Sequence, residues 1–413
     1  MTAEKVTTIA LTADRLINSI DQEPIENVAI LIEGTKIISV GGRNIIPPNA
    51  KVIELQNTTL MPGLIDTHCH PMSSITDEYQ TEHLRYSSAY KTLRGLKTVT
   101  RQLEAGWTSL RGAGELDVGY GVIDLKNAFL KKMHTGPNLC GAAHYISITG
   151  GGGDIAYLSH EQPIIPDGLI VDGERQMQKV VRNEIKRGSD WIKLLVSGAF
   201  MTAHDNPEDT HMTYDEIAMA VSTAKQFSIP VMAHAHGAKA IKDSINAGVR
   251  SIEHGTFVDE EGVDLMVKNG TYLVPTLYIG DHFIENEADN PAAEKMVSLS
   301  KKFRKRYFAC IRAAIEAGVK VTVGVDFGEE DPHLSTRELS CLAEAGYSPM
   351  EAIVAATRTG AELLGWDQKL GSIEVGKVAD IIAVPKNPLE DLSLLEKVSF
   401  VMKSGDVIKH QAD

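Results

Sequence analysis

One pattern recurs along the sequence and restricts the fold more than any other feature. A segment with helical periodicity ends in glycine, and an apolar, β-branched run begins within a few residues. Glycine after a helix adopts the left-handed conformation of a C-terminal cap. The runs that follow are apolar on both faces, as are the strands of a parallel sheet that is covered on both sides. The pattern occurs at Gly106, Gly188, Gly248, Gly270 and Gly318.

Three further apolar runs, at 64–70, 138–149 and 230–234, bring the number of predicted strands to eight between residues 62 and 326. Segments with helical periodicity separate these runs. An alternation of strand and helix predicts an α/β protein with a parallel sheet. Eight such units in about 310 residues favour a (β/α)8 TIM barrel over an open, doubly wound sheet.

The two ends of the chain follow a different pattern. Residues 28–40 contain two short β runs joined at a glycine, and residues 398–408 again read as strand, turn and strand. Short antiparallel strands at both ends predict one small β-sandwich domain built from both termini. We therefore expect the N-terminal part of this domain at 1–60, the barrel at 61–369, and the C-terminal part of the β domain at 370–413.

Composition excludes several classes of protein. The 413 residues are 43% hydrophobic and 23% charged, which is typical of a globular protein. With 41 basic and 55 acidic residues, the net charge of −14 argues against nucleic-acid and polybasic membrane partners. The sequence has no eighteen-residue apolar run, no signal-peptide pattern at its start and four widely separated cysteines. We expect a cytoplasmic protein with reduced thiols and without nucleic-acid or membrane partners.

Metal-ligand residues fall at the ends of several predicted strands. His68 and His70 close the first strand, and alternation along a strand turns both imidazoles to the same face. His234 ends the fifth strand, His254 ends the sixth, and Asp326 ends the eighth. The C-terminal ends of barrel strands meet at one rim, where barrel enzymes have their active sites. This combination of imidazoles and a carboxylate predicts a metal site.

Lys193 is a further candidate for this site because it lies within the apolar run 191–196. A buried lysine is costly unless it is paired or neutral. Two interpretations are open at this stage. The side chain either extends outward from the barrel, or it faces the metal site as a carbamate formed with carbon dioxide, which would bridge two ions.

This set of ligands on strands 1, 4, 5, 6 and 8 resembles that of the amidohydrolase superfamily. Flanking motifs narrow the resemblance to metal-dependent dipeptidases of the imidazolonepropionase-like branch. That branch includes Xaa-Pro and Xaa-Arg/Lys dipeptidases and enzymes that hydrolyse ochratoxin-type amides. The motifs are Met-Pro-Gly-Leu-Ile-Asp-Thr-His-Cys-His at 61–70, Met-Ala-His-Ala-His at 232–236, Ser-Ile-Glu-His-Gly at 251–255 and Leu-Gly-Ser-Ile-Glu-Val-Gly-Lys-Val-Ala-Asp at 370–380.

The resemblance implies two divalent ions, with zinc expected. His68, His70 and Asp326 would hold one ion, and His234 and His254 the other. Carboxylated Lys193 and a hydroxide would bridge them. The hydroxide would attack the amide carbonyl, and Asp326 would pass its proton to the departing amine.

Three positions depart from the pattern of the branch. Glycine occupies position 152, where a histidine is expected, so His144 is a candidate for the missing role, with Gly151 approaching the substrate. His236 replaces a tyrosine and could donate a hydrogen bond to the substrate carboxylate. Residues 111–112 read Arg-Gly where Arg-Asp is usual, and Arg111 is either a structural arginine of the barrel interior or an anchor for an anion. We thus consider Asp326, His236 and His144 catalytic candidates, and His236, His144, Arg111 and Gly151 substrate-binding candidates.

The sequence therefore predicts a metal-dependent hydrolase that cleaves the amide bond to a C-terminal amino acid. Dipeptides of the Xaa-Pro type are the leading substrate class, and N-acyl amino acids and ochratoxin-type amides are also compatible with the sequence. Within the superfamily, cyclic-amide opening and deamination are alternatives. A non-catalytic barrel that serves as a scaffold is an alternative of another class, although such a protein would be expected to lose ligands, and none of the six is lost. We expect a homo-oligomer, with an octamer among the forms considered.

Overall fold

The computed structural model describes residues 7–74, 81–154, 159, 161–162, 164–202, 205–286 and 293–411. Its larger part is an eight-stranded sheet in which seven parallel strands follow the order β5–β6–β7–β9–β10–β11–β12, while β8 (Leu169–Ile170) pairs with β7. Those seven strands are β5 (Leu64–Cys69), β6 (Trp107–Glu115), β7 (Asn138–Ser147), β9 (Ile192–Leu195), β10 (Val231–Ala235), β11 (Ser251–His254) and β12 (Tyr272–Val274).

An extended segment at 319–326 closes this sheet into a barrel. On one side, the Leu273 amide of β12 donates to the Lys320 carbonyl over 2.9 Å. On the other side, the Thr67 amide of β5 donates to the Val323 carbonyl over 3.0 Å. The segment therefore occupies the eighth strand position between β12 and β5. The predicted (β/α)8 barrel is confirmed.

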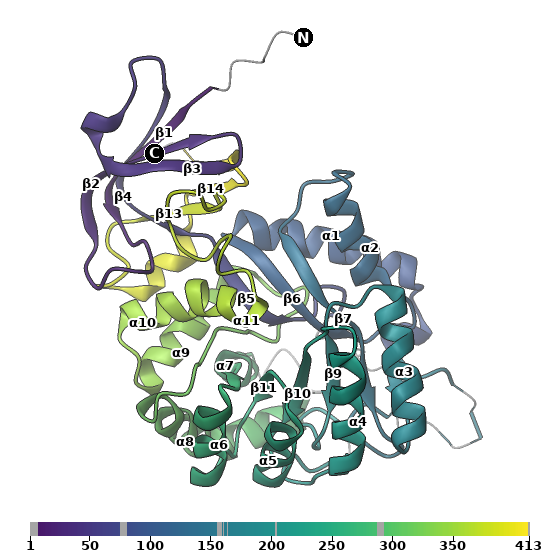
Figure 1. Ribbon diagram of the computed structural model, residues 1–413. Helices are drawn as coiled ribbons and strands as arrows, with labels where there is room; N and C mark the ends of the chain where they lie inside the picture. Colours follow the sequence, from purple (N-terminus) through teal and green to yellow (C-terminus); the bar gives the residue numbers. More distant parts are fainter. Residues whose placement is uncertain are drawn as a thin grey trace.

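Helices surround the barrel strands, as Figure 1 shows. They are α1 (Ser88–Glu104), α2 (Gly121–Leu130), α3 (Glu174–Arg187), α4 (Tyr214–Lys225), α5 (Ala238–Ala247), α6 (Glu260–Asn269), α7 (Leu277–Glu285), α8 (Glu294–Glu316), α9 (Arg337–Ala345), α10 (Pro349–Val354) and α11 (Gly360–Leu364). Gly188, Gly248 and Gly270 are the C-terminal caps of α3, α5 and α6, with φ of 104°, 97° and 65°. Glycine is the residue that takes this left-handed conformation without strain, which is why the sequence pattern located these helix ends.

A second sheet combines strands from both ends of the chain. Its order is β15–β14–β13–β4–β1–β2–β3, so the two C-terminal hairpin strands and β13 continue a sheet begun by the N-terminal residues. In Figure 1 the yellow-green strands accordingly lie beside the purple ones. The strands are β1 (Ile9–Leu16), β2 (Ile25–Glu33), β3 (Lys36–Gly42), β4 (Lys51–Pro62), β13 (Ile381–Pro385), β14 (Phe400–Lys403) and β15 (Asp406–His410). The predicted β domain from both termini is confirmed.

Covalent and polar links hold the small sheet against the barrel. The chain passes from β4 to β5 with one residue between them, so the first barrel strand starts where the sheet ends. The Lys403 ammonium donates to Asp380 over 3.1 Å and to Asn138 at the start of β7 over 3.0 Å. Both contacts are partly or fully buried. The sheet therefore packs against the N-terminal end of the barrel strands, and the C-terminal mouth of the barrel stays accessible.

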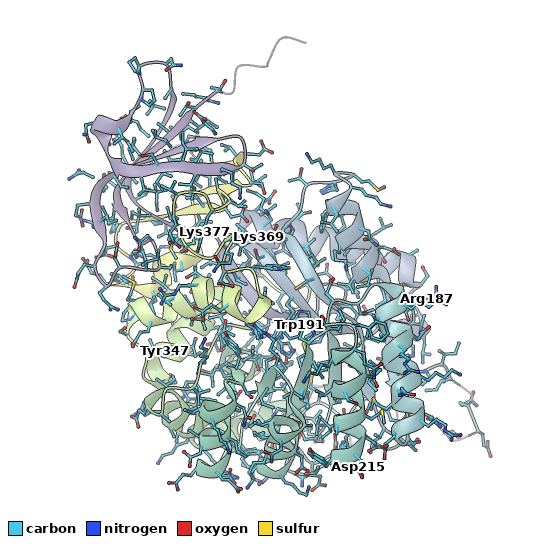
Figure 2. All side chains as sticks on the ribbon, viewed as in Figure 1. Arg187, Trp191, Asp215, Tyr347, Lys369 and Lys377 are labelled. Atoms are coloured by element: carbon cyan, nitrogen blue, oxygen red, sulfur yellow. The ribbon has the colours of Figure 1, made fainter. Side chains whose placement is uncertain are left out.

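The interior of the barrel is filled with side chains. Trp191, which precedes β9, is 3% exposed and lies among packed side chains in Figure 2, whereas Asp215 on α4 lies at the edge of the molecule. A filled barrel has no pore, and its chemistry is confined to the rim. Among the helices that the structure describes, none is both long and apolar enough to cross a membrane.

Candidate metal centre

The six predicted metal ligands meet at one end of the barrel. His68 lies in β5, Lys193 in β9, His234 in β10 and His254 in β11, and each precedes the C-terminal end of its strand by no more than two residues. His70 and Asp326 follow β5 and the closing segment. All six line a single cavity at the C-terminal mouth. The structure therefore brings together every residue that the sequence predicted as a ligand.

Three of these residues form the first ligand group. His68 Nε2 and His70 Nε2 lie 3.3 Å and 3.0 Å from the same oxygen of Asp326. The ligand atoms of the three side chains are all within 4.8 Å of one another. Two imidazoles and a carboxylate at this spacing are a donor set typical of a divalent zinc-like cation.

The second ligand group contains one residue that the sequence analysis did not place there. His234, His236 and His254 have ligand atoms within 4.8 Å of one another, and all three are buried. The ring centroids of His236 and His254 are 4.8 Å apart, with 21° between their planes. A signal for this grouping was present, because His234 and His236 repeat the His-x-His spacing of His68 and His70. Residues two apart on a strand face the same side.

Outer partners orient the imidazoles. His70 Nδ1 donates to the Gly114 carbonyl over 2.8 Å. His254 Nδ1 and His236 Nδ1 lie 2.8 Å and 2.7 Å from the hydroxyls of Thr276 and Thr256. With Nδ1 bonded outward, Nε2 of each ring is left for a metal ion, and such contacts fix which nitrogen binds.

His234 has the opposite arrangement. Its Nε2 donates to the Gly198 carbonyl over 3.2 Å, which leaves Nδ1 toward the centre. Burial is the main cause that lowers the pKa of His234 and of His254 well below the ordinary value. Burial also lowers the pKa of His236, to about 3. These imidazoles are therefore neutral near pH 7, and the neutral form is the one that binds metal ions.

Asp326 is the anion of the site. Burial alone would raise its pKa, but the charges and hydrogen bonds of His68 and His70 together hold the pKa well below the usual value. Its backbone has a φ of 64°, and His254 has a φ of 68°. Residues other than glycine rarely adopt this left-handed conformation, and such strain concentrates at functional sites.

Lys193 faces the cavity. Its Nζ lies 3.4 Å from His68 Nε2, and the residue is 2% exposed. Burial is the main cause that lowers the pKa of Lys193 to about 8. Of the two interpretations that the sequence left open, an outward-pointing lysine is therefore wrong. A substantial fraction of the amine is neutral near pH 8, which is the form that reacts with carbon dioxide.

Beneath the centre lies a buried carboxylate that the sequence analysis missed. Glu253 Oε2 is 2.6 Å from His68 Nδ1, and Arg111 donates to both oxygens of Glu253 over 2.9 Å. Burial would raise the pKa of Glu253, but the Arg111 charge and the His68 contact lower it to about 2. A carboxylate that accepts the outer N–H of a ligand histidine fixes the ring and raises its basicity. The available signal was an acidic residue directly before the ligand His254, in the four-residue run Ser-Ile-Glu-His.

Arg111 is accordingly a structural residue, and its interpretation as an anion anchor is wrong. Its side chain is 0% exposed and its guanidinium stacks over Trp191 at 4.5 Å from the ring centroid. Glu253 already neutralises its charge. The guanidinium lies in the barrel interior, below the residues that line the cavity, because residue 111 is in the middle of β6 rather than at its C-terminal end.

His144 and Gly151 also lie outside the lining of the cavity. His144 Nδ1 is 3.1 Å from Glu184 on α3, and its ring meets Tyr120 edge-on at 4.8 Å. Alternation along β7 explains the difference, since Tyr145 lines the cavity and its neighbour therefore faces the helix layer. Because His144 faces the helices, the prediction that it replaces the missing histidine is wrong. The position of Gly151 outside the cavity lining does not support the predicted contact between Gly151 and the substrate.

Other residues occupy the place of the missing histidine. A Cβ on Gly152 would lie 3.0 Å from Asp205 Oδ2, so Asp205 fills the space that a side chain would need. The Gly152 amide donates to His211 Nδ1 over 3.2 Å, and His211 Nε2 lies 3.2 Å from Asp205. Both residues come from the segment between β9 and α4, which sequence spacing alone could not place beside residue 152.

Above the ligands, the wall of the cavity is mainly apolar. Phe200 lies over His236 with 4.8 Å between ring centroids, and Phe303 stands 6.1 Å from Phe200. A mostly apolar cavity with a few convergent polar groups is the usual form of a small-molecule site. The apolar lining residues include Phe200, Met201, Ile279, Met296, Phe303 and Phe308.

The donor chemistry fits divalent metal ions. Two groups of three ligand atoms lie at one barrel rim, and outer hydrogen bonds orient His70, His236 and His254. Burial lowers the pKa of all three imidazoles in the second group. Imidazole nitrogen is a common ligand of zinc and other borderline divalent cations, and zinc also accepts a carboxylate oxygen in the same site.

Comparisons with known proteins agree with this site. Residues 59–409 match the amidohydrolase family. The chain is 30% identical to an ochratoxinase of Aspergillus niger over 418 aligned positions, which cover 94% of this chain and 84% of that protein. A Xaa-Pro dipeptidase solved with bound methionine superposes with a TM-score of 0.90 at 32% identity, covering 97% of this chain and 99% of the other. A prolidase solved with N-methylphosphonate-L-proline gives a TM-score of 0.90 at 29% identity, covering 98% and 100%.

A closed barrel with metal-ligand groups at its C-terminal mouth defines a metal-dependent hydrolase. The chain belongs to the amidohydrolase family, whose match spans most of its length. It is therefore an enzyme of the class that hydrolyses amide bonds.

The contact between Glu253 and His68 generates a first prediction. Glu253→Gln should lower the affinity for divalent ions by about 10- to 100-fold, because His68 loses its anionic partner. Chelator competition on the purified protein measures the affinity, and a denaturant curve checks that the variant is folded. Glu261→Gln, on the exposed side of α6, is the matched control. Equal metal affinity in the folded Glu253→Gln variant would show that this contact does not support the centre.

Proposed function

We propose that the protein is a binuclear metal-dependent amidohydrolase that releases a C-terminal amino acid from dipeptides or N-acyl amino acids. Xaa-Pro dipeptides are the leading substrates. The observation that carries the proposal is the pair of ligand groups at the floor of an apolar cavity. Relatives named Xaa-Pro dipeptidase and prolidase support the substrate class, because these names describe cleavage of the peptide bond of a dipeptide, and a relative named ochratoxinase supports the second candidate.

In this proposal the chain's own residues hold two divalent ions, with zinc as the expected metal. His68, His70 and Asp326 would bind one ion, and His234 and His254 the other. Lys193, in its neutral form, would add carbon dioxide through its amine and release a proton, giving a carbamate between the two groups. Bound divalent ions supply Lewis-acid activation of the amide carbonyl and of the attacking water.

Asp326 is the proposed proton carrier. Its low pKa keeps it ionised at neutral pH, so it can accept a proton from the attacking water. The same carboxyl would then deliver this proton to the nitrogen of the departing amine, which is general acid–base catalysis. His68 and His70 hold the carboxylate in place through their contacts to one of its oxygens.

The cavity wall supports a preference within this substrate class. Three phenylalanines and two methionines contribute to the lining. Burying an apolar group of the substrate against them favours binding by about 25 cal/mol per Å² of apolar area. We therefore place a bulky apolar group of the substrate here. Aromatic N-acyl groups of the ochratoxin type fit this surface as a second candidate.

A screen of defined substrates tests the function. Purified protein supplied with zinc is incubated with Xaa-Pro dipeptides, other dipeptides, N-acyl amino acids, a cyclic amide and an aminopurine, and products are separated by chromatography. We expect hydrolysis confined to linear amides that release a free amino acid. Turnover of the cyclic amide or deamination alone would assign the site to another reaction of the family, and no turnover of any compound would contradict the proposal.

Replacing the proposed proton carrier should separate chemistry from binding. Asp326→Asn should lower kcat by roughly 10²- to 10⁴-fold, the usual contribution of a positioned acid–base group, while the variant retains more of its metal than of its turnover. Asp331→Asn, in the exposed part of the same loop, is the control. Steady-state kinetics and metal analysis are measured on one preparation. Near-native kcat in the Asn variant would mean that another group moves the proton.

The carbamate on Lys193 has its own spectroscopic test. After equilibration with ¹³C-labelled bicarbonate and zinc, the protein should show one carbamate resonance by carbon NMR. Lys193→Ala should lack this resonance and lose activity, and short carboxylic acids should restore part of that activity. Lys239→Ala, on the surface of α5, should keep the resonance. A wild-type spectrum without a carbamate signal, recorded on active enzyme, would refute this modification.

A further inference from the structure

Part of the cavity wall is acidic rather than apolar. Two carboxylates that are not metal ligands, Asp154 and Asp167, line the cavity. In the part of the chain that the structure describes, no lysine or arginine forms a salt bridge with either of them. Arg304 also lines the cavity, but Asp281 and Glu344 already neutralise its charge. This wall therefore presents negative charge that the chain itself leaves uncompensated.

Tyr145 fixes the position of Asp167. The Tyr145 hydroxyl donates a hydrogen bond to Asp167 Oδ1, and Asp167 is buried. The ring of Tyr145 fits between Gly153 and Gly168, where a Cβ at either glycine would overlap it. Tyr145 is also paired with Lys193 in the register of β7 and β9, so it lies beside the metal centre. The carboxylate of Asp167 is thus held in one orientation near the place where an amide would be cleaved.

The second oxygen of Asp167 lacks a donor. Among the described residues, no side chain donates a hydrogen bond to Oδ2. His83 Nδ1 lies 3.9 Å away, which is too far for a hydrogen bond, and this nitrogen has no hydrogen-bond partner of its own. Burial raises the pKa of Asp167, because the charged form has lost solvation by water. A cation with several N–H donors would satisfy this carboxylate, since buried charges are normally paired.

We propose that Asp167 binds the α-ammonium group of a dipeptide substrate and is a specificity residue of the site. An ammonium group offers three N–H donors, and the free oxygen of Asp167 can accept one of them. This inference rests on the proposed function and deepens it. Dipeptides carry an α-ammonium group and N-acyl amino acids do not, so the contact favours dipeptides over N-acyl amino acids.

Two compounds that differ only in the ammonium group test this role. Phe-Pro carries the group, and 3-phenylpropanoyl-L-proline lacks it. With zinc-loaded enzyme, Asp167→Asn should lower kcat/KM for Phe-Pro by about 10- to 100-fold, the usual effect of losing a hydrogen bond to a charged group. The same substitution should leave kcat/KM for the analogue nearly unchanged. Asparagine keeps the shape of the side chain and can still accept from Tyr145, and thermal unfolding checks that the variant is folded.

Two further variants separate this contact from other effects. Asp172→Asn removes an exposed carboxylate from the neighbouring segment and should leave the ratio of the two kcat/KM values as in the wild type. Asp154→Asn removes the other carboxylate of the wall and should change the ratio less than Asp167→Asn does. An equal change in Asp154→Asn would assign the effect to the general charge of the wall. Equal losses for both compounds in Asp167→Asn would show a structural role, and either result would overturn the proposal.

Calorimetry on metal-free protein separates this inference from the proposed function, because binding is then measured without turnover. Asp167→Asn should weaken binding of Phe-Pro and leave binding of the analogue unchanged. If zinc-loaded enzyme hydrolyses neither compound, the proposed function fails, and the binding comparison still decides the role of Asp167. Equal affinity of wild-type protein and Asp167→Asn for Phe-Pro, or no binding of Phe-Pro to either protein, would contradict the inference.

Discussion

The contact between β5 and the segment 319–326 is the constraint on which the site depends. Hydrogen bonds from Thr67 to Val323 and from Asp326 to the His68 carbonyl, at 3.0 Å and 2.7 Å, join the first and eighth positions of the barrel. They bring residues more than 250 positions apart in the sequence into one ligand group. Without this closure, Asp326 would have no reason to lie beside His68 and His70.

The charges beneath the rim must be balanced because they are remote from water. Arg111 and Glu253 are both fully buried, and each satisfies the other through two hydrogen bonds. Removing one member of such a buried pair typically costs about 3–5 kcal/mol. The pair therefore couples the stability of the barrel interior to the orientation of His68, so metal binding and folding share the same contacts. The left-handed backbone at His254 and Asp326 is a second cost that the surrounding packing must offset.

The sequence predicted the fold and most of the metal centre because both follow from local periodicity. Glycine caps marked the helix ends, strand alternation placed His68 and His70 on one face, and the resemblance of the motifs supplied the family. What it could not give were contacts set by tertiary packing. His144 is on the side of β7 that faces the helices, where it contacts Glu184. Arg111 is in the middle of β6 and therefore lies below the cavity. The segment after β9 places His211 and Asp205 beside Gly152. The spacing between His234 and His236 was visible in the sequence, but it was interpreted as placing His236 against the substrate and not within the second ligand group.

The central claim is that the two ligand groups act together as one hydrolytic centre. Metal-free protein can be titrated with zinc in the presence of bicarbonate while bound zinc and amide hydrolysis are followed in the same samples. If both ligand groups contribute, activity rises with the second equivalent and reaches its plateau at two ions per chain. Full activity at one bound ion per chain, with no further increase when the second binds, would contradict a binuclear centre.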